Sequence, residues 1–420
     1  MLTNLAAARY GALGLPLAFV ALPLYVLLPA HYAALGVPLA WLGLVLLGTR
    51  LFDAVLDPWL GRWVDGLWSP PKAWSVAAWA VLALGLGFAA LFFPLVAGVV
   101  PLMVWCAVAL MGTFIAFSLA SVIHQSWGSR LGGSVGQRSR LVAWREGLGL
   151  LGVLMANVLA TQAGLAVTTA ALWTLLALGL WALASAPEPW RAPQAVGVRP
   201  VVVLATHTAS LALPWRGPEF RRLLALFMLN GVASAIPATL VIFFINDRVQ
   251  APAWTAVFLG AYFLMGAASV PLWVRLVARV GPSTAWAWGM VLNVLGFVGV
   301  LAVGAGDTTL YLAVCVASGL ALGADLTVPG TLLTGVIQRA GDAGRAEGAY
   351  AGWWHLATKL NLALAAGLSL PALQAMGYAP GARDASALLA LTLVYGALPC
   401  LFKLMTLGLW WRLWHRQGLE

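Results

Sequence analysis

Charged side chains are scarce in this sequence. Asp, Glu, Lys and Arg together make up 9% of the 420 residues, whereas 62% of the residues are hydrophobic. Soluble globular domains carry about 25% charged residues. The composition therefore excludes a soluble protein and indicates an all-α chain that crosses a membrane several times.

Acidic residues are the rarer of the two signs, with 13 Asp and Glu against 23 Lys and Arg. The basic residues gather in alternate short gaps between apolar runs, for example Arg138, Arg140 and Arg145 in one gap. The positive-inside rule then places both termini and every second loop in the cytoplasm. The charge is mostly arginine and nothing resembles a eukaryotic targeting signal, so a bacterial inner membrane is the default expectation. We expect a monomer whose surroundings are the bilayer and not nucleic acid.

Cysteine is rare as well, and catalytic patterns are missing. Cys106, Cys315 and Cys400 lie inside apolar runs without metal-ligand spacing, so we expect them to pack as free side chains. The sequence has no phosphate-binding loop and no nucleophile beside a plausible base. We therefore expect no enzyme activity and no organic cofactor.

Long apolar runs are abundant, and about 20 residues suffice for one transmembrane helix. A basic, proline-containing stretch at 188–219 separates a bundle at 1–187 from a second at 220–420. This layout, about twelve helices in two six-helix bundles, is that of the major facilitator superfamily, with a central site between the halves. We expect spans near 10–32, 37–60, 73–95, 98–126, 140–162, 166–187, 221–246, 253–274, 283–304, 308–337, 348–376 and 385–411.

The stretch GTRLFDAVLDPWLGRWVD puts Arg50, Asp53 and Asp57 on successive turns of one helix. An aspartate at the centre of a membrane helix costs roughly 2.5 to 3.5 kcal/mol, so this pair needs a stabilising partner. Arg50 can neutralise only one of the two carboxylates. We interpret the pair as a site for sodium, lithium or a proton; the alternative is a structural salt bridge with Arg50 or with a basic residue of a neighbouring helix.

Further polar residues lie in the expected fourth and fifth spans. FSLASVIHQSW brings Ser121, His124 and Gln125 into the fourth span. A histidine there can carry protons, or it can simply form a hydrogen bond to a neighbour. Arg145 enters the fifth span and can face the cavity, so we count it among the candidate substrate residues.

The second half holds two deep charges, Asp325 in GADLTVPG and Lys359 in HLATKLNL. We predict that Lys359 pairs with Asp53 or Asp57 across the two halves. The cation and the lysine would then compete for the same carboxylates, which links ion occupancy to conformation. The alternative is that Lys359 extends towards the membrane surface.

Three segments together resemble a known family. RLFDAVLDPWLGRWVD resembles the signature of the glycoside-pentoside-hexuronide:cation symporters, the melibiose permease group of the major facilitators. RSRLVAWR is similar to a second segment of that family, and GADLTVPGTLLTGVI with GRAEGAYAGWWHLATKL is similar to its block of spans ten and eleven. The resemblance implies that Asp53 and Asp57 bind the cation, that Arg145 lies near the substrate and that Lys359 lies near the cation.

The sequence also departs from that family. Its span-one aspartate is replaced by an apolar residue near Ala18, its acidic or asparagine position in span four is Ser121, and its aromatic position there is Gln125. Gly335 stands where an acidic residue follows the proline of span ten. A pocket this poor in acids does not favour galactosides. The family also resembles animal lysophospholipid symporters, which keep the paired aspartates and carry amphiphiles.

The sequence thus predicts a secondary active transporter, a cation-coupled symporter that works by alternating access on a glycoside or an amphiphilic, lipid-like solute. One alternative is an uncoupled facilitator or a proton-coupled exporter of an apolar compound. Another is a non-transporting membrane sensor or assembly partner. Substrate-dependent flux separates the transporters from the last class, and cation dependence separates the first two.

Overall fold

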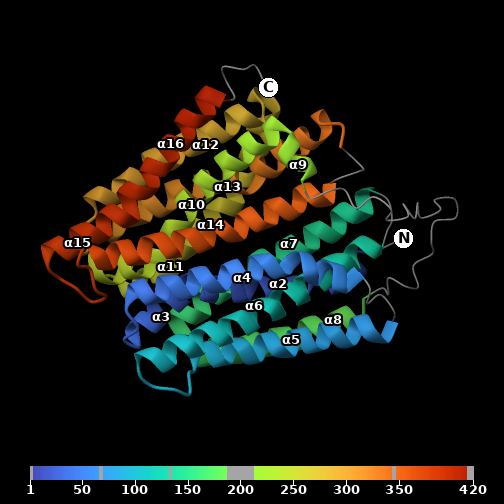
Figure 1. The fold of residues 1–420 in the computed structure, drawn as a ribbon, viewed down its shortest axis with the longest axis horizontal. Coiled ribbons are helices and arrows are strands. Elements are labelled where there is room, and N and C mark those ends of the chain that lie inside the picture. Colours follow the sequence, from blue (N-terminus) through green and yellow to red (C-terminus); the bar gives the residue numbers. More distant parts are fainter. Residues whose placement is uncertain (1–2, 66–69, 132–134, 187–211, 343–346, 414–420) are drawn as a thin grey trace. The chain divides into compact units, whose positions relative to one another are not determined.

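The computed structural model describes residues 3–65, 70–131, 135–186, 212–342 and 347–413, and the regular structure in them is helical (Figure 1). The elements of the first half are α1 (Asn4–Gly11), α2 (Gly14–Leu22), η1 (Pro23–Leu27), α3 (Leu28–Ala34), α4 (Leu39–Asp65), α5 (Pro70–Phe92), α6 (Val99–Arg130), α7 (Val135–Val158), η2 (Leu159–Ala163) and α8 (Gly164–Ala184). Those of the second half are α9 (Leu213–Arg216), α10 (Pro218–Phe243), η3 (Phe244–Val249), η4 (Pro252–Trp254), α11 (Thr255–Val280), α12 (Pro282–Phe297), η5 (Val298–Ala302), α13 (Thr308–Arg339), α14 (Glu347–Ala375), α15 (Ala385–Thr392), η6 (Leu393–Ala397) and α16 (Leu398–Leu413).

Within the described residues, 11 helical stretches are long and apolar enough to cross a membrane. The fifth, Trp144–Ala184, has 41 residues, about twice the length that one crossing needs. It contains most of α7, the segment η2 and all of α8, and Gly164 at the start of α8 has a φ of +83°, which glycine adopts without strain. Counting α7 and α8 separately gives twelve spans among the described residues, the number expected from the sequence.

The chain divides into two compact units. The first comprises residues 1–37 and 48–206, and the second comprises residues 38–47 and 207–420. The second unit thus includes the beginning of α4, where the Ala40 amide donates a hydrogen bond of 2.7 Å to the side chain of Gln374 in α14. Residues 188–211 of the expected linker lie outside the described residues, so the domain bounds expected from the sequence stay a prediction.

In the first unit, α2 packs along α7, and α5 packs along α6 and α8 (Figure 1). The contact between α2 and α7 brings two backbones together. A Cβ atom at Gly152 in α7 would collide with the carbonyl oxygen of Leu15 in α2. Because a backbone oxygen inside a packed helix cannot move aside, glycine is required at this position.

Replacing Gly152 by alanine is therefore expected to destabilise the protein by about 1 to 3 kcal/mol, the usual cost of overpacking. The thermal unfolding midpoint of the detergent-purified protein, followed by tryptophan fluorescence, measures the effect. Gly147 in the same helix has open space around its Cα, so Gly147→Ala serves as the matched control and should not lower the midpoint. Equal midpoints for both variants would contradict the proposed close approach.

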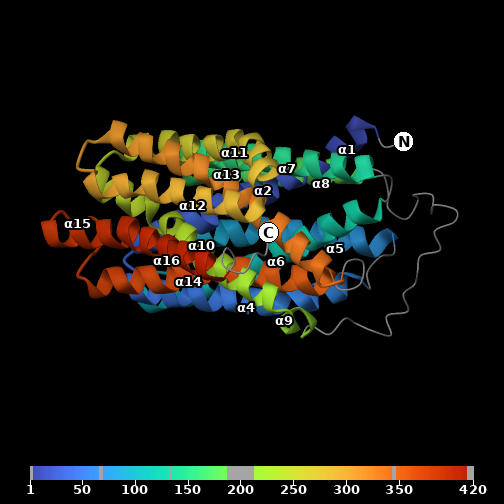
Figure 2. The ribbon, with the colours of Figure 1, turned by 90° about the horizontal axis from the view of Figure 1, so that it is seen from above.

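In the second unit, α13 lies beside both α11 and α12 (Figure 2), and α10 packs against α14 and α16. Large apolar side chains fill the space between these helices; Phe220, Trp286, Leu332 and Tyr350 are among the buried members of the cluster. The three cysteines Cys106, Cys315 and Cys400 are free and buried, as the sequence predicts. Polar contacts between the packed helices are concentrated in a few places.

One of these places is a cluster around Asp247 at the end of α10 and η3, which we call the Asp247 clasp. The Tyr378 hydroxyl and the Gly381 amide both donate to Asp247 Oδ2, and Arg383 forms an ion pair of 3.5 Å with Oδ1. Burial and the hydrogen bond to Asp247 raise the pKa of Tyr378 above its ordinary value, so the hydroxyl stays protonated and able to donate. The clasp holds the loop between α14 and α15 against the end of η3.

Candidate cation and substrate site

Asp53 is the most buried of the aspartates predicted to bind a cation. Its side chain lies on α4 and is 5% exposed, and its Oδ1 accepts a hydrogen bond of 3.0 Å from the Ser118 hydroxyl of α6. Asp57 follows one helical turn later and is half-buried. Carboxylate and hydroxyl oxygens are the ligands that hard cations prefer, so the donor set of α4 and α6 fits a sodium or lithium ion.

Ser118 rather than Ser121 is the serine bonded to Asp53. Ser121 lies three residues further along α6 and is half-buried, and Gln125 lies one turn beyond it and is exposed. Residues three and four apart share a helical face, so Ser121 and Gln125 lie on the same side of α6 as Ser118. The predicted roles of Ser121 in cation binding and Gln125 in substrate binding stay predictions.

Arg50 lies one turn before Asp53 on α4 and is 4% exposed. Its guanidinium carbon lies 4.8 Å from the centre of the Tyr25 ring, which belongs to the π-helical segment η1. Such a cation–π contact contributes about 0.5 to 2 kcal/mol. Among the described residues, Nε and Nη1 of Arg50 have no hydrogen-bond partner.

His124 on α6 is 1% exposed and is held against α1. Its Nε2 lies 2.8 Å from the Tyr10 carbonyl oxygen, and the Tyr10 hydroxyl donates to the His124 carbonyl oxygen at 3.1 Å. The two rings lie 4.6 Å apart. These reciprocal contacts join α1 to α6. They match one of the two alternatives given by the sequence, in which His124 forms a hydrogen bond to a neighbour; the other alternative was a proton-carrying role.

Arg145 on α7 is paired with its neighbour along the chain. Its Nη2 lies 2.6 Å from Glu146 Oε1, and the two side chains are 26% and 66% exposed. An exposed ion pair of this kind contributes little to stability, typically less than 1 kcal/mol. The guanidinium is partly exposed, and its predicted contact with a substrate stays a prediction. Arg138 and Arg140 lie outside the side chains that the structure describes.

The second unit contains a buried charge network that the sequence analysis revealed only in part. Asp325 of α13 accepts hydrogen bonds from Asn230 and Trp286 on Oδ1, both at 2.9 Å, and from Ser234 and Lys403 on Oδ2, at 3.2 and 3.0 Å. Lys403 also donates to Asn230 Oδ1 at 2.8 Å. Four helices, α10, α12, α13 and α16, therefore meet at one carboxylate whose oxygens are fully engaged.

Lys403 was not predicted as a buried charge from the sequence, although its sequence context is the same as that of Lys359. Each is a lone lysine within a long apolar run. Lys403 is 1% exposed and bonded to Asp325, whereas Lys359 lies half-buried on α14. Lys359 belongs to the second unit, and Asp53 and Asp57 belong to the first. Their predicted pairing stays a prediction.

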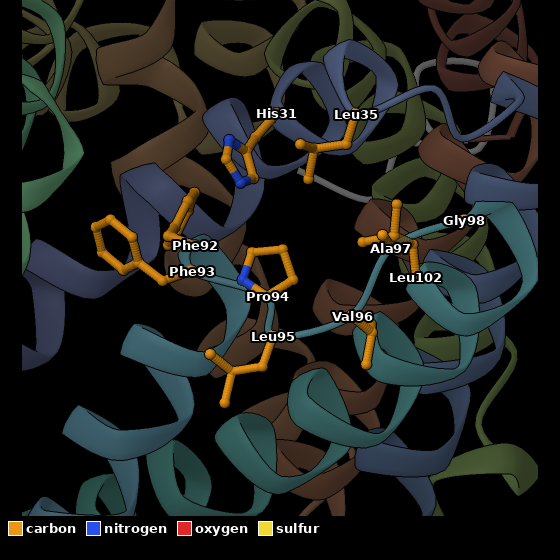
Figure 3. Close-up of a pocket in the computed structure, with 10 residues that line it drawn as sticks. All are labelled: His31, Leu35, Phe92, Phe93, Pro94, Leu95, Val96, Ala97, Gly98 and Leu102. Carbon is orange, nitrogen blue, oxygen red and sulfur yellow. The ribbon is translucent and has the colours of Figure 1, made fainter.

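A separate cavity of about 480 Å³ lies in the first unit, where the loop between α5 and α6 meets the end of α3 (Figure 3). His31 supplies a polar ring at its wall, 5.4 Å from the ring of Phe92. The other walls are apolar, namely Leu35, Phe92, Phe93, Pro94, Leu95, Val96, Ala97, Gly98 and Leu102. The cavity includes no carboxylate and so does not match the chemistry of the aspartate pair.

Charged side chains buried inside membrane-spanning helices usually mark the pathway of a substrate or an ion. The chain belongs to the family described as MFS/sugar transport protein, whose sequence profile matches residues 7–414. It is a transporter and not an enzyme. The match extends over nearly the whole chain. It establishes the superfamily, and the narrower melibiose permease group stays a prediction.

Solved transporter structures share the fold. The nucleoside transporter NupG aligns with a TM-score of 0.71 at 14% identity, covering 97% of this chain and 99% of that one. A bacterial homologue of the human lysosomal transporter Spinster, inward-facing and unoccupied, aligns with a TM-score of 0.74 at 14% identity, covering 97% and 95%. A bacterial homologue of the iron transporter ferroportin, inward-facing, aligns at 0.61 and 16% identity, covering 98% and 99%. A comparison with curated protein sequences gave no match.

Proposed function

We propose that this transporter is a cation-coupled symporter that works by alternating access. A monovalent cation binds at Asp53 and Asp57, and the substrate is a glycoside or an amphiphilic, lipid-like solute. The observation that carries the proposal is the buried Asp53 carboxylate, bonded to Ser118 and followed one turn later by Asp57. The protein works in a bacterial inner membrane as a monomer with both termini in the cytoplasm.

The charges on α4 supply the physical reason. Arg50, Asp53 and Asp57 together carry a net charge of −1 within two helical turns. An excess charge inside a membrane is costly, and one bound monovalent cation removes it. Linkage then requires that a cation which tightens substrate binding is itself bound more tightly by the same factor when substrate is present.

Residues around this centre complete the proposed mechanism. Arg145, His124 and Gln125 belong to the substrate side, and Ser121 adds an oxygen near the cation. Lys359 competes with the cation for the carboxylates when the carrier is empty. Coupling follows, because the carboxylates are compensated by Lys359 in the empty carrier and by the cation in the loaded carrier, whereas a carrier with only substrate leaves them uncompensated.

Sodium or lithium is expected to raise the thermal unfolding midpoint of the detergent-purified protein, relative to potassium and choline at equal ionic strength. A ligand of the folded state at 100 times its dissociation constant stabilises by about 2.7 kcal/mol. Asp53→Asn should abolish the sodium effect, and Ser118→Ala should weaken it, since one hydrogen bond to a charged group contributes about 1.5 to 3 kcal/mol.

Asp307→Asn is the matched control, because this aspartate is exposed in the loop before α13. The control should keep the full sodium response. The midpoint of the wild type could instead be insensitive to alkali cations but change with pH, with no such change in Asp53→Asn. That result would mean that the coupling ion is a proton. A midpoint that responds to neither would favour uncoupled transport of an apolar compound.

A further inference from the structure

The buried guanidinium of Arg50 has hydrogen-bonding capacity that its described surroundings do not use. Nε and Nη1 have no hydrogen-bond partner among the described residues, although the side chain is 4% exposed and both atoms are closed off from water in this conformation. Leaving a buried charged donor unsatisfied costs more than the roughly 1 to 3 kcal/mol of a neutral one. Buried polar groups of this kind call for a ligand or another specific explanation.

The second unit shows the contrasting arrangement. Lys403 is equally buried, and its ammonium donates to both Asn230 and Asp325. Every oxygen of Asp325 is engaged in turn by a donor of a neighbouring helix. That charge centre is complete without any ligand, whereas Nε and Nη1 of Arg50 have no acceptor among the described residues and the guanidinium carbon lies over the Tyr25 ring.

We propose that Arg50 binds an anionic group of the transported substrate, either a carboxylate or a phosphate. The inference rests on the proposed symport function and names the substrate class of that site. A guanidinium presents its N–H groups as a planar fork that matches two oxygens of a carboxylate or phosphate. In the present conformation the Tyr25 ring covers the guanidinium, and the anion takes its place when the site opens.

The neighbouring aspartates make this anion dependent on the cation. Asp53 and Asp57 would repel an anion that approaches Arg50, because they lie within two turns of it on α4. A cation bound between the carboxylates removes that repulsion. Cation and anion therefore bind more tightly together than apart, and the coupling proposed above gains a direct electrostatic cause.

Small anions test the site without knowledge of the complete substrate. The thermal midpoint of the purified protein would be measured in acetate, in phosphate and in chloride at equal ionic strength, each as the sodium and as the choline salt. Acetate or phosphate should raise the wild-type midpoint above that in chloride in a saturable manner. Acetate alone would identify a carboxylate, and phosphate alone a phosphate. The effect should be larger in sodium than in choline.

Arg50→Gln should lose the response to the anion. Arg50→Lys keeps the charge and lacks the fork, so the half-saturating concentration should rise about tenfold or more, equivalent to about 1.4 kcal/mol. Arg50→Lys also keeps the test usable if Arg50→Gln does not fold. The control is Arg339→Gln, because Arg339 is 43% exposed and paired with Glu219 at the end of α13; this variant should respond like the wild type.

A wild-type midpoint that is no higher in acetate or phosphate than in chloride would overturn the proposal. An equal response of wild type and Arg50→Gln would overturn it as well, because a general salt effect does not depend on one buried side chain. Failure of the proposed cation coupling gives a different result. In that case sodium and choline salts act alike, while the Arg50-dependent response to the anion persists.

Discussion

Asp57→Asn is expected to abolish cation-driven accumulation of substrate while the protein remains folded. The substitution keeps the shape of the side chain and removes one of the two negative charges that we propose hold the cation. We expect the apparent affinity for the cation to fall by about 100-fold or more, equivalent to roughly 2.8 kcal/mol. Uptake into proteoliposomes under an imposed sodium gradient measures the effect, once a screen of glycosides and amphiphiles has given a wild-type substrate.

The same experiment on Asp307→Asn separates the loss of a particular carboxylate from the loss of any negative charge. Asp307 is exposed, and this control should accumulate substrate like the wild type. Substrate exchange across the membrane at equal cation concentrations would show that Asp57→Asn still opens and closes. A folded Asp57→Asn protein that accumulates substrate down a sodium gradient at the wild-type level would refute the assignment of this aspartate.

Lys403→Met is expected to give the largest loss of stability in the second unit. The variant leaves the Asp325 carboxylate, 17% exposed, without its positive partner. Removing one partner of a buried ion pair typically costs about 3 to 5 kcal/mol. The thermal midpoint of the purified protein should fall accordingly, and the tryptophan near the charge, Trp286, makes intrinsic fluorescence a suitable probe.

A second substitution at Asp325 tests whether the loss comes from the uncompensated charge. Lys403→Met combined with Asp325→Asn removes both charges and keeps an acceptor oxygen for Asn230 and Trp286. The double variant should regain most of the stability, since the coupling energy between contacting residues is what such a cycle measures. A single variant as stable as the wild type would mean that the pair does not hold α13 and α16 together.

The fold could be predicted from the sequence because the bilayer imposes a simple rule. Every spanning helix needs about 20 apolar residues, so the apolar runs reveal the spans without knowledge of side-chain packing. The boundaries differ from those expected: the expected span 98–126 is the longer helix Val99–Arg130, and the expected span 140–162 begins earlier, at Val135. Polar residues near the ends of helices do not mark where the hydrogen bonding of the backbone stops.

The candidate site could be predicted only as far as single helices allow. Arg50, Asp53 and Asp57 follow one another on α4, so spacing alone places them on one face. Which serine of α6 meets Asp53 depends on the rotation of α6 about its axis, and α6 carries apolar side chains on all sides. The partnership of Asp325 with Lys403 is harder still, because it joins residues 78 positions apart whose nearness only the packed helices create.

The Asp247 clasp has a consequence for reagents that recognise the protein. Three contacts from Tyr378, Gly381 and Arg383 fix the loop at 376–384 to the end of η3. An antibody raised against this loop in the native protein would therefore recognise a conformational epitope that a free peptide of the same sequence does not reproduce. Such an antibody would report on whether the second unit is folded, independently of any transport assay.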